Sequence, residues 1–146
     1  MKKKMILTMA MIGLLLTTVA CAAVNAEERT NEMKVTITID ELVNNNHIEK
    51  QVDIAAGDTL TVTLGSNPTT GFSWDDNAQV SDEFVLNQTN HEYHAPDTDV
   101  LGAAGNDEWT FKALKAGETT VKLEYSRPWE GGEKGEWTFN LTVKVK

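Results

Sequence analysis

The chain has 146 residues and a formal net charge of −9, with 40% hydrophobic and 24% charged residues. This length and composition indicate a single globular domain and argue against a two-domain enzyme.

The N-terminal segment has the pattern of an export signal. Lys2, Lys3 and Lys4 precede an uncharged apolar run over residues 5–20, which is the order of a secretory signal. The run is shorter than the roughly 20 residues that span a bilayer as a helix. We therefore expect residues 1–20 to be a signal peptide and the protein to be exported, to the cell envelope, the periplasm or the exterior.

Two processing sites follow this run. Residues 18–21 (TVAC) resemble a bacterial lipobox, which would make Cys21 a lipid-bearing N-terminus, although Thr18 stands where leucine is usual. Residues 24–26 (VNA) offer instead the pattern of ordinary signal peptidase, with cleavage after Ala26. The sequence favours the lipoprotein because its only cysteine stands where such a motif ends. Membrane contact is then expected only through a lipid at Cys21.

Processing changes the chemistry that remains available. No cysteine is left in the folded body, which excludes disulfides, thiolate catalysis and cysteine-based zinc sites. Removal of residues 1–20 takes away three lysines and no acid, so the charge changes from −9 to −12. An acidic surface opposes binding to phosphate backbones and anionic membranes. We expect no nucleic-acid partner.

Residues 21–32 are expected to be a flexible tether, because they lack apolar periodicity. From Met33 onward the sequence alternates with period two, as in half-buried strands. Only residues 40–46 are compatible with a turn of helix. The inward positions are Val35, Ile37, Ile39, Ile48, Val52, Ile54, Leu60, Val62, Leu64, Phe72, Trp74, Trp109, Phe111, Ala113, Val121, Leu123, Tyr125, Trp137, Phe139, Leu141, Val143 and Val145.

The three prolines and the glycine-containing turns fall between these runs. Many short strands at this spacing predict an all-β, immunoglobulin-like β-sandwich of seven to eight antiparallel strands over residues 33–146. The lack of a cysteine pair excludes an antibody-type domain pinned by a disulfide.

The first unusual loop is Asn67-Pro68-Thr69-Thr70-Gly71-Phe72. Proline fixes its own φ, and glycine permits a backbone conformation that other residues avoid, so the loop should be stiff. Such a segment is either a tight turn between strands or a shaped tip that offers hydroxyl and amide groups to a partner.

The second loop, over residues 126–132, contains Arg127, Pro128 and Trp129. Trp129 is the one tryptophan of four outside the strand alternation. It is either a lid that folds back over one end of the sandwich or an anchor for a partner.

A third loop, over residues 100–106, contains Gly102, Ala103, Ala104 and Gly105. By itself it suggests a mobile connection. In a Greek-key sandwich, however, several loops gather at one end of the fold.

These three motifs, with the strand around Trp109-Thr110-Phe111-Lys112-Ala113, resemble the chagasin family of cysteine peptidase inhibitors over residues 33–146. The resemblance implies a monomer without metal or cofactor that reversibly occludes the cleft of papain-like cysteine peptidases. It implies that residues 67–72 enter the cleft, with Arg127, Pro128 and Trp129 on one side and residues 102–105 on the other. Ala104 stands where the family usually has glycine.

Other functions have weaker support. His91, His94, Asp97 and Asp99 carry enough ligand atoms for a metal site, but they lack a helix to align them, and we interpret the histidines as solvated surface residues. No hydrolase, zinc-peptidase or dinucleotide motif occurs. The alternative to an inhibitor is a non-inhibitory, secreted or lipid-anchored immunoglobulin-like binding module that uses Trp129.

Overall fold

The computed structural model describes residues 30–146, and most of them lie in strands. The expected signal peptide, Cys21, the cleavage site after Ala26 and the tether up to residue 29 lie outside the described residues. Within residues 30–146, no helix has the length and apolar character needed to cross a membrane.

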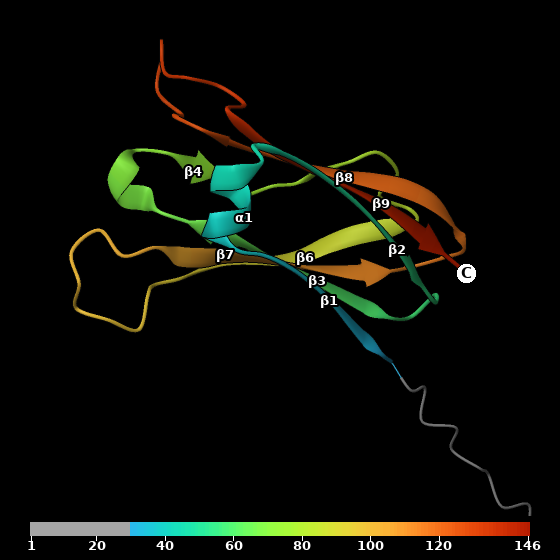
Figure 1. The fold of residues 1–146 in the computed structure, drawn as a ribbon. Coiled ribbons are helices and arrows are strands. Elements are labelled where there is room, and N and C mark those ends of the chain that lie inside the picture. The colour runs from blue at the N-terminus through green and yellow to red at the C-terminus, as the bar shows by residue number, and fades with distance from the viewer. Residues whose placement is uncertain (1–29) are drawn as a thin grey trace, which may run out of the picture.

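The fold is a sandwich of two sheets, as the alternation predicted (Figure 1). The first sheet contains, in spatial order, β1 (Glu32–Ile37), β3 (Thr59–Ser66), β7 (Gly105–Ala113) and β6 (Leu86–His94). The second contains β2 (His47–Ile54), β9 (Trp137–Val145), β8 (Gly117–Ser126) and β4 (Ser73–Trp74), and β5 (Gln79–Val80) also pairs with β8.

Strand direction differs in part from the expectation of antiparallel pairing. β1 runs parallel to β3, and β2 runs parallel to β9, whereas the other pairs are antiparallel. The chain passes from β1 in one sheet to β2 in the other before it returns to the first sheet as β3, beside β1 and in the same direction. The described residues form nine strands, two of which have only two residues.

The alternating residues form the core between the sheets. Side chains such as Leu60, Val62, Trp109, Phe111 and Phe139 are fully buried. The period of two therefore correctly identified the inward faces of β3, β7, β8 and β9.

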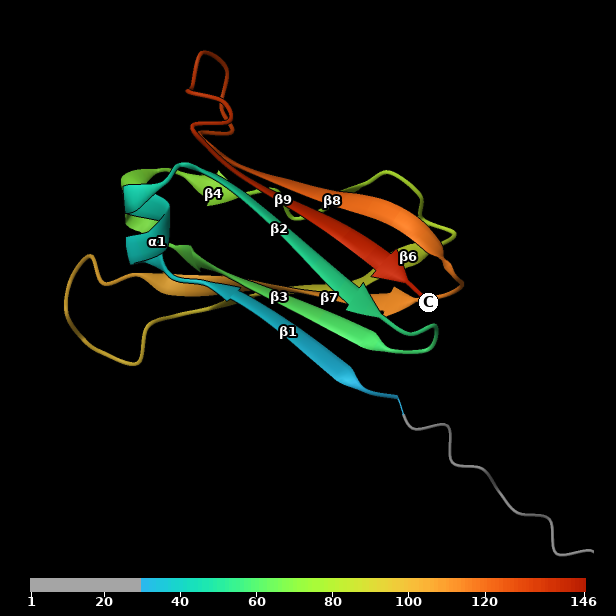
Figure 2. The same cartoon turned by 45° about the vertical axis from the view of Figure 1, so that its right-hand side comes forward.

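Ile39 does not extend the first strand as expected but begins a helix, α1 (Ile39–Asn44). Thr38 Oγ1 accepts a hydrogen bond from the Glu41 backbone N–H at 3.3 Å, and Glu41 Oε2 accepts one from the Thr38 N–H at 2.9 Å. This reciprocal pair is a capping box, which fixes a helix start. The helix lies at one end of the sandwich, beside residues 67–72, as the two views agree (Figure 1 and Figure 2).

β6 is a strand that the alternation did not predict. Leu86 is its only fully buried residue, and its pairing with β7 shifts register between Gln88 and Asn90. Such a shift breaks the period of two. His91 and His94 both lie on this strand.

Candidate functional site

The three predicted loops meet at one end of the sandwich because of strand register. Ser66, at the end of β3, pairs with Gly105, at the start of β7. Ser126, at the end of β8, pairs with Ser73, which follows the first loop. Residues 67–72, 95–104 and 127–136 therefore leave the sheets at the same end (Figure 1).

The central turn is closed by its own hydrogen bonds. Pro68–Thr70 form a short 3₁₀ helix, and Asn67 Oδ1 accepts from the Thr69 N–H at 3.3 Å and from Thr69 Oγ1 at 2.6 Å. Thr70 Oγ1 donates to the Asn67 carbonyl at 2.7 Å, and Gly71 has a φ of +81°. The turn is stiff, as predicted, but both threonine hydroxyls donate inside it and not outward.

Phe72 supports this turn from below. Its side chain is buried, stacks on Tyr125 at 5.5 Å and meets the edge of Trp137 at 5.3 Å. Tyr125 Oη also accepts a hydrogen bond from the Asn67 N–H at 2.8 Å. Aromatic side chains therefore support the turn from beneath, and Phe72 is buried among them and not displayed at the tip.

On one side, the central turn is hydrogen-bonded to the third loop, over residues 100–106. Asn67 Nδ2 donates to the Gly102 carbonyl at 2.9 Å. The backbone at Ala104 does not require glycine, because its φ is not positive. Within residues 30–146 only glycines have a positive φ. Gly105 is buried in β7, where a Cβ would come within 2.3 Å of the His94 carbonyl. The surface of this loop is therefore formed by residues before Gly105. They include the fully exposed Leu101, which lies in the predicted loop but was not among its predicted contact residues.

Arg127, from the second loop, contacts the turn on the side away from the third loop. Its Nη2 donates to the Thr70 carbonyl at 3.5 Å, and its Nη1 pairs with Glu133 Oε2 at 2.8 Å. The guanidinium also lies 4.6 Å from the centroid of the Phe72 ring. A planar cation over an aromatic face is a favourable contact, so Arg127 is held against the turn.

Trp129 lies against the turn and is still 51% exposed. A Cβ placed on Gly71 would come within 2.8 Å of Trp129 Cη2. Lys134 Nζ donates to the Trp129 carbonyl at 3.0 Å. The ring is therefore both folded back on the turn and available to a partner.

The carboxyl groups with displaced pKa values lie outside these loops. Burial raises the pKa of Asp75, which follows β4. Hydrogen bonds from the backbone of Ala55 and Asn31 lower the pKa of Asp58, and those from Thr38 lower that of Glu41.

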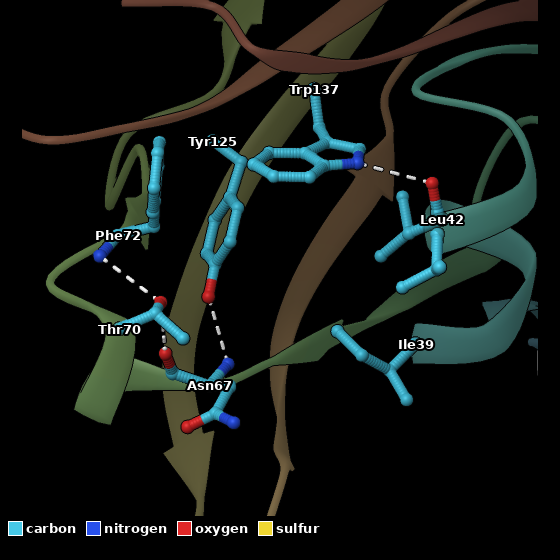
Figure 3. A pocket seen from close by; sticks show the side chains of 8 residues that line it. Ile39, Leu42, Asn67, Thr70, Phe72, Tyr125 and Trp137 are labelled. Atoms are coloured by element: carbon cyan, nitrogen blue, oxygen red, sulfur yellow. Dashed lines mark hydrogen bonds between the residues drawn. The ribbon is translucent and has the colours of Figure 1, made fainter. Parts of the chain in front are cut away.

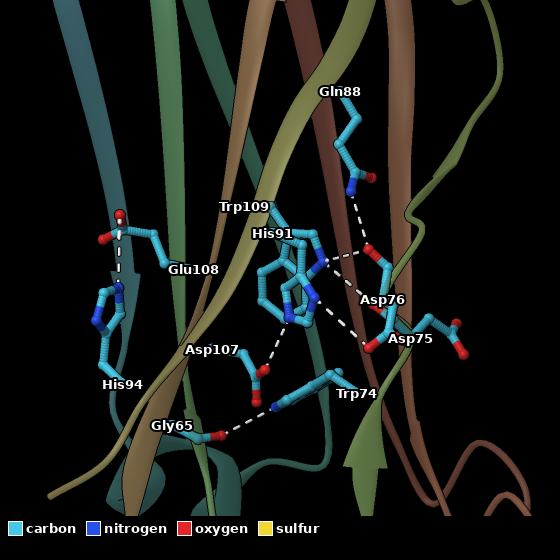
Figure 4. Close-up of polar contacts among 10 residues, drawn as sticks. All are labelled: Gly65, Trp74, Asp75, Asp76, Gln88, His91, His94, Asp107, Glu108 and Trp109. Carbon is cyan, nitrogen blue, oxygen red and sulfur yellow. Dashed lines mark hydrogen bonds and ion pairs between the residues drawn. The ribbon is translucent and has the colours of Figure 1, made fainter.

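The four candidate metal ligands do not come together. His91 stacks on Trp109 with centroids 4.8 Å apart, and its Nε2 lies 2.8 Å from Asp107 Oδ1 (Figure 4). Our interpretation of His91 as a solvated residue is therefore wrong, because it covers a core tryptophan. His94 Nε2 lies 3.9 Å from Glu108 Oε1. Within residues 30–146, no group of three or more histidine, cysteine or acidic residues is arranged to hold a metal ion.

The chain is thus a two-sheet, immunoglobulin-like sandwich with three loops joined at one end, an architecture that presents a surface for binding. The family model of the Chagasin family peptidase inhibitor I42 matches residues 53–143. The chain therefore belongs to the chagasin family, whose members are peptidase inhibitors and not enzymes.

Individual relatives agree with this assignment. The chain is 31% identical to chagasin of Trypanosoma cruzi over 101 residues, which cover 68% of this chain and 92% of chagasin. It is 36% identical to amoebiasin-2 of Entamoeba histolytica over 93 residues, which cover 64% of this chain and 75% of that protein.

A solved structure extends the likeness to three dimensions. The cysteine protease inhibitor EhICP2 of Entamoeba histolytica matches with a TM-score of 0.64 and 25% identity, over 81% of this chain and 98% of its own. PbICP-C, solved in complex with falcipain-2, shares the fold with a TM-score of 0.52 and 16% identity, over 80% of this chain and 99% of its own.

Proposed function

We propose that the chain is a reversible, non-covalent inhibitor of papain-like cysteine peptidases that occludes their active-site cleft with three loops. The observation that carries this proposal is a pair of hydrogen bonds, which join the central turn to the loop on each side of it. Asn67 Nδ2 reaches Gly102, and Arg127 Nη2 reaches the Thr70 carbonyl. The three loops thus form one continuous surface.

The surface has a centre and two flanks. Residues 67–71 form the centre and enter the cleft. Arg127, Pro128 and Trp129 form one flank, and residues 102–104 form the other. Phe72 and Gly105 lie beneath this surface and keep the turn and the third loop in position. A surface already fixed by its own hydrogen bonds loses little conformational freedom on binding.

The chemistry of the target explains why a tight turn suits this role. A papain-like peptidase holds a nucleophilic thiolate and its histidine in a groove. An inhibitor must fill the groove without presenting a peptide bond in reactive geometry. The 3₁₀ turn at Pro68–Thr70 takes the backbone out of the extended conformation. It therefore blocks the catalytic thiolate and histidine without being cleaved.

Inhibition assays test this function. The purified protein is titrated against papain and a cathepsin, with trypsin as the control, and its mass is measured after incubation. We expect loss of both cysteine peptidase activities, unchanged trypsin activity and an intact inhibitor. Binding to papain without loss of activity would assign the chain to the non-inhibitory modules instead.

We also propose that the protein is exported and acts as a monomer, with a lipid at Cys21 as its membrane anchor. The charged and apolar order of residues 2–20 and the position of the only cysteine support export and lipidation. Labelled palmitate should enter the wild type and not Cys21→Ala. Light scattering of the protein released from the membrane should give the mass of one chain.

A further inference from the structure

An apolar pocket lies beside the central turn, between that turn and helix α1 (Figure 3). Its volume is about 260 Å³. The apolar side chains that line it come from α1, from the turn and from β8 and β9: they are Ile39, Leu42, Val43, Phe72, Tyr125 and Trp137.

The polar atoms around the pocket are already bonded within the protein. Tyr125 Oη accepts from the Asn67 N–H at 2.8 Å, and Trp137 Nε1 donates to the Leu42 carbonyl at 3.1 Å. Thr70 Oγ1 donates to the Asn67 carbonyl at 2.7 Å. A buried water needs two to four polar partners to be held well. The interior of the pocket therefore suits an apolar occupant better than water.

The size of the pocket limits that occupant. An apolar cavity of about 150 Å³ accepts a benzene ring, and this pocket is larger. Val43, which lines it, is 73% exposed, so the pocket is reached from the surface. A leucine, methionine or phenylalanine side chain from another molecule fits such a space.

The pocket is continuous with the surface assigned to peptidase binding. Asn67 and Thr70 belong to the central turn and also line the pocket. Helix α1 lies at the same end of the sandwich as the three loops (Figures 1 and 2). A peptidase that receives the turn therefore approaches the pocket as well.

We propose that this pocket receives an apolar side chain from the rim of the peptidase cleft, which makes α1 a fourth contact. The inference rests on the proposed inhibitory function. Anchors of this kind that fill a desolvated pocket account for much of the energy of protein interfaces. The pocket then contributes to selection among papain-like peptidases, because their rims differ in side chain while their catalytic pair does not.

Substitution of Val43 tests the proposal. Val43→Glu and Val43→Lys both place a charge at the pocket, and we expect each to raise the inhibition constant about tenfold or more, mainly through faster dissociation. Both signs of charge are used because a simple long-range charge effect would change sign between them. Leu114→Glu and Leu114→Lys are the matched controls, since Leu114 is also exposed but follows β7 at the opposite end. They should inhibit like the wild type.

A second readout locates the contact directly. In the methyl-labelled protein, the signals of Ile39, Leu42 and Val43 should shift when papain is added, and those of Leu114 should not. Shifts that appear on concentrating the protein alone would assign the pocket to a second copy and overturn the proposal.

The outcomes separate this proposal from the proposed function. Normal inhibition by both Val43 variants, with inhibition lost in Trp129→Ala, would overturn the pocket contact and leave the inhibitor in place. A wild-type protein that fails to inhibit any papain-like peptidase would overturn both.

Discussion

Trp129 and Gly71 lie so close together that no methyl group fits between them. A Cβ on Gly71 would come within 2.8 Å of Trp129 Cη2 and within 3.4 Å of its Cζ3. One flank of the surface thus rests on the backbone of the central turn, and the absence of a side chain at residue 71 allows this.

Gly71→Ala should therefore impair inhibition more than it impairs folding. Alanine at a φ of +81° is strained by about 1–3 kcal/mol, and its methyl group displaces Trp129. Gly57→Ala is the control, since Gly57 has a φ of +91° and no atom within 4 Å of its added Cβ. Thermal melts should show similar losses for both variants, whereas only Gly71→Ala should raise the inhibition constant. Equal inhibition constants for Gly71→Ala and Gly57→Ala would show that the contact between Trp129 and the turn does not contribute to inhibition.

Trp129→Ala should weaken inhibition by about 2 kcal/mol or more, which is about 30-fold, as expected of a central aromatic anchor. The melting temperature should change little, because the side chain is half exposed. Phe84→Ala serves as the control: Phe84 is 78% exposed and precedes β6 at the opposite end of the sandwich. A Trp129→Ala protein that inhibits papain like the wild type would remove this residue from the site.

Two substitutions of Asn67 should separate the two roles of its amide. Asn67→Asp keeps an oxygen that accepts from Thr69, but it cannot donate to the Gly102 carbonyl. Asn67→Ala loses both interactions. We expect Asn67→Asp to retain most of the stability and to inhibit about tenfold less well, since losing a hydrogen bond costs about 1 kcal/mol and leaves a carboxylate facing a carbonyl. Asn67→Ala should lose stability as well, which urea titration measures. Unchanged inhibition by Asn67→Asp would show that the link between the loops is dispensable.

Asp75→Asn should stabilise the protein at neutral pH. Burial raises the pKa of Asp75, so the folded state disfavours its charge. Above the folded pKa the wild type carries this cost, and below the unfolded pKa both states are protonated and the cost disappears. The melting temperature of Asp75→Asn should exceed that of the wild type at pH 7, and the difference should close on acidification. Asp97→Asn, at an exposed carboxyl, controls for the change in net charge. A difference that persists at low pH would have another origin.

The sequence predicted the sandwich and its inward faces because alternation is a local pattern. It did not predict β6, where His91 covers Trp109 in place of an apolar residue and the register shift breaks the period. It did not predict the parallel pairing of β1 with β3 either, since local patterns contain no information on strand direction.

The loops of the site were predicted as segments, and their connections were not. Nothing in the sequence pairs Asn67 with Gly102, because these residues are 35 positions apart and meet only through the register of β3 with β7. Phe72 was predicted both as an inward strand position and as part of the loop that meets the peptidase. Its packing on Tyr125 and Trp137 confirms the inward position.

The parallel pairing of β1 with β3 has a mechanical consequence. Glu32 begins β1 opposite Thr59, far from the turn that follows β3 at Ser66 (Figure 1). If a lipid held the N-terminus at a membrane, as we propose, and a peptidase held the turn, the tension between them would act along these strands. Backbone hydrogen bonds between parallel strands are evenly spaced and slant across that direction. The six-residue ladder would therefore be loaded in shear as a whole and could not unzip bond by bond.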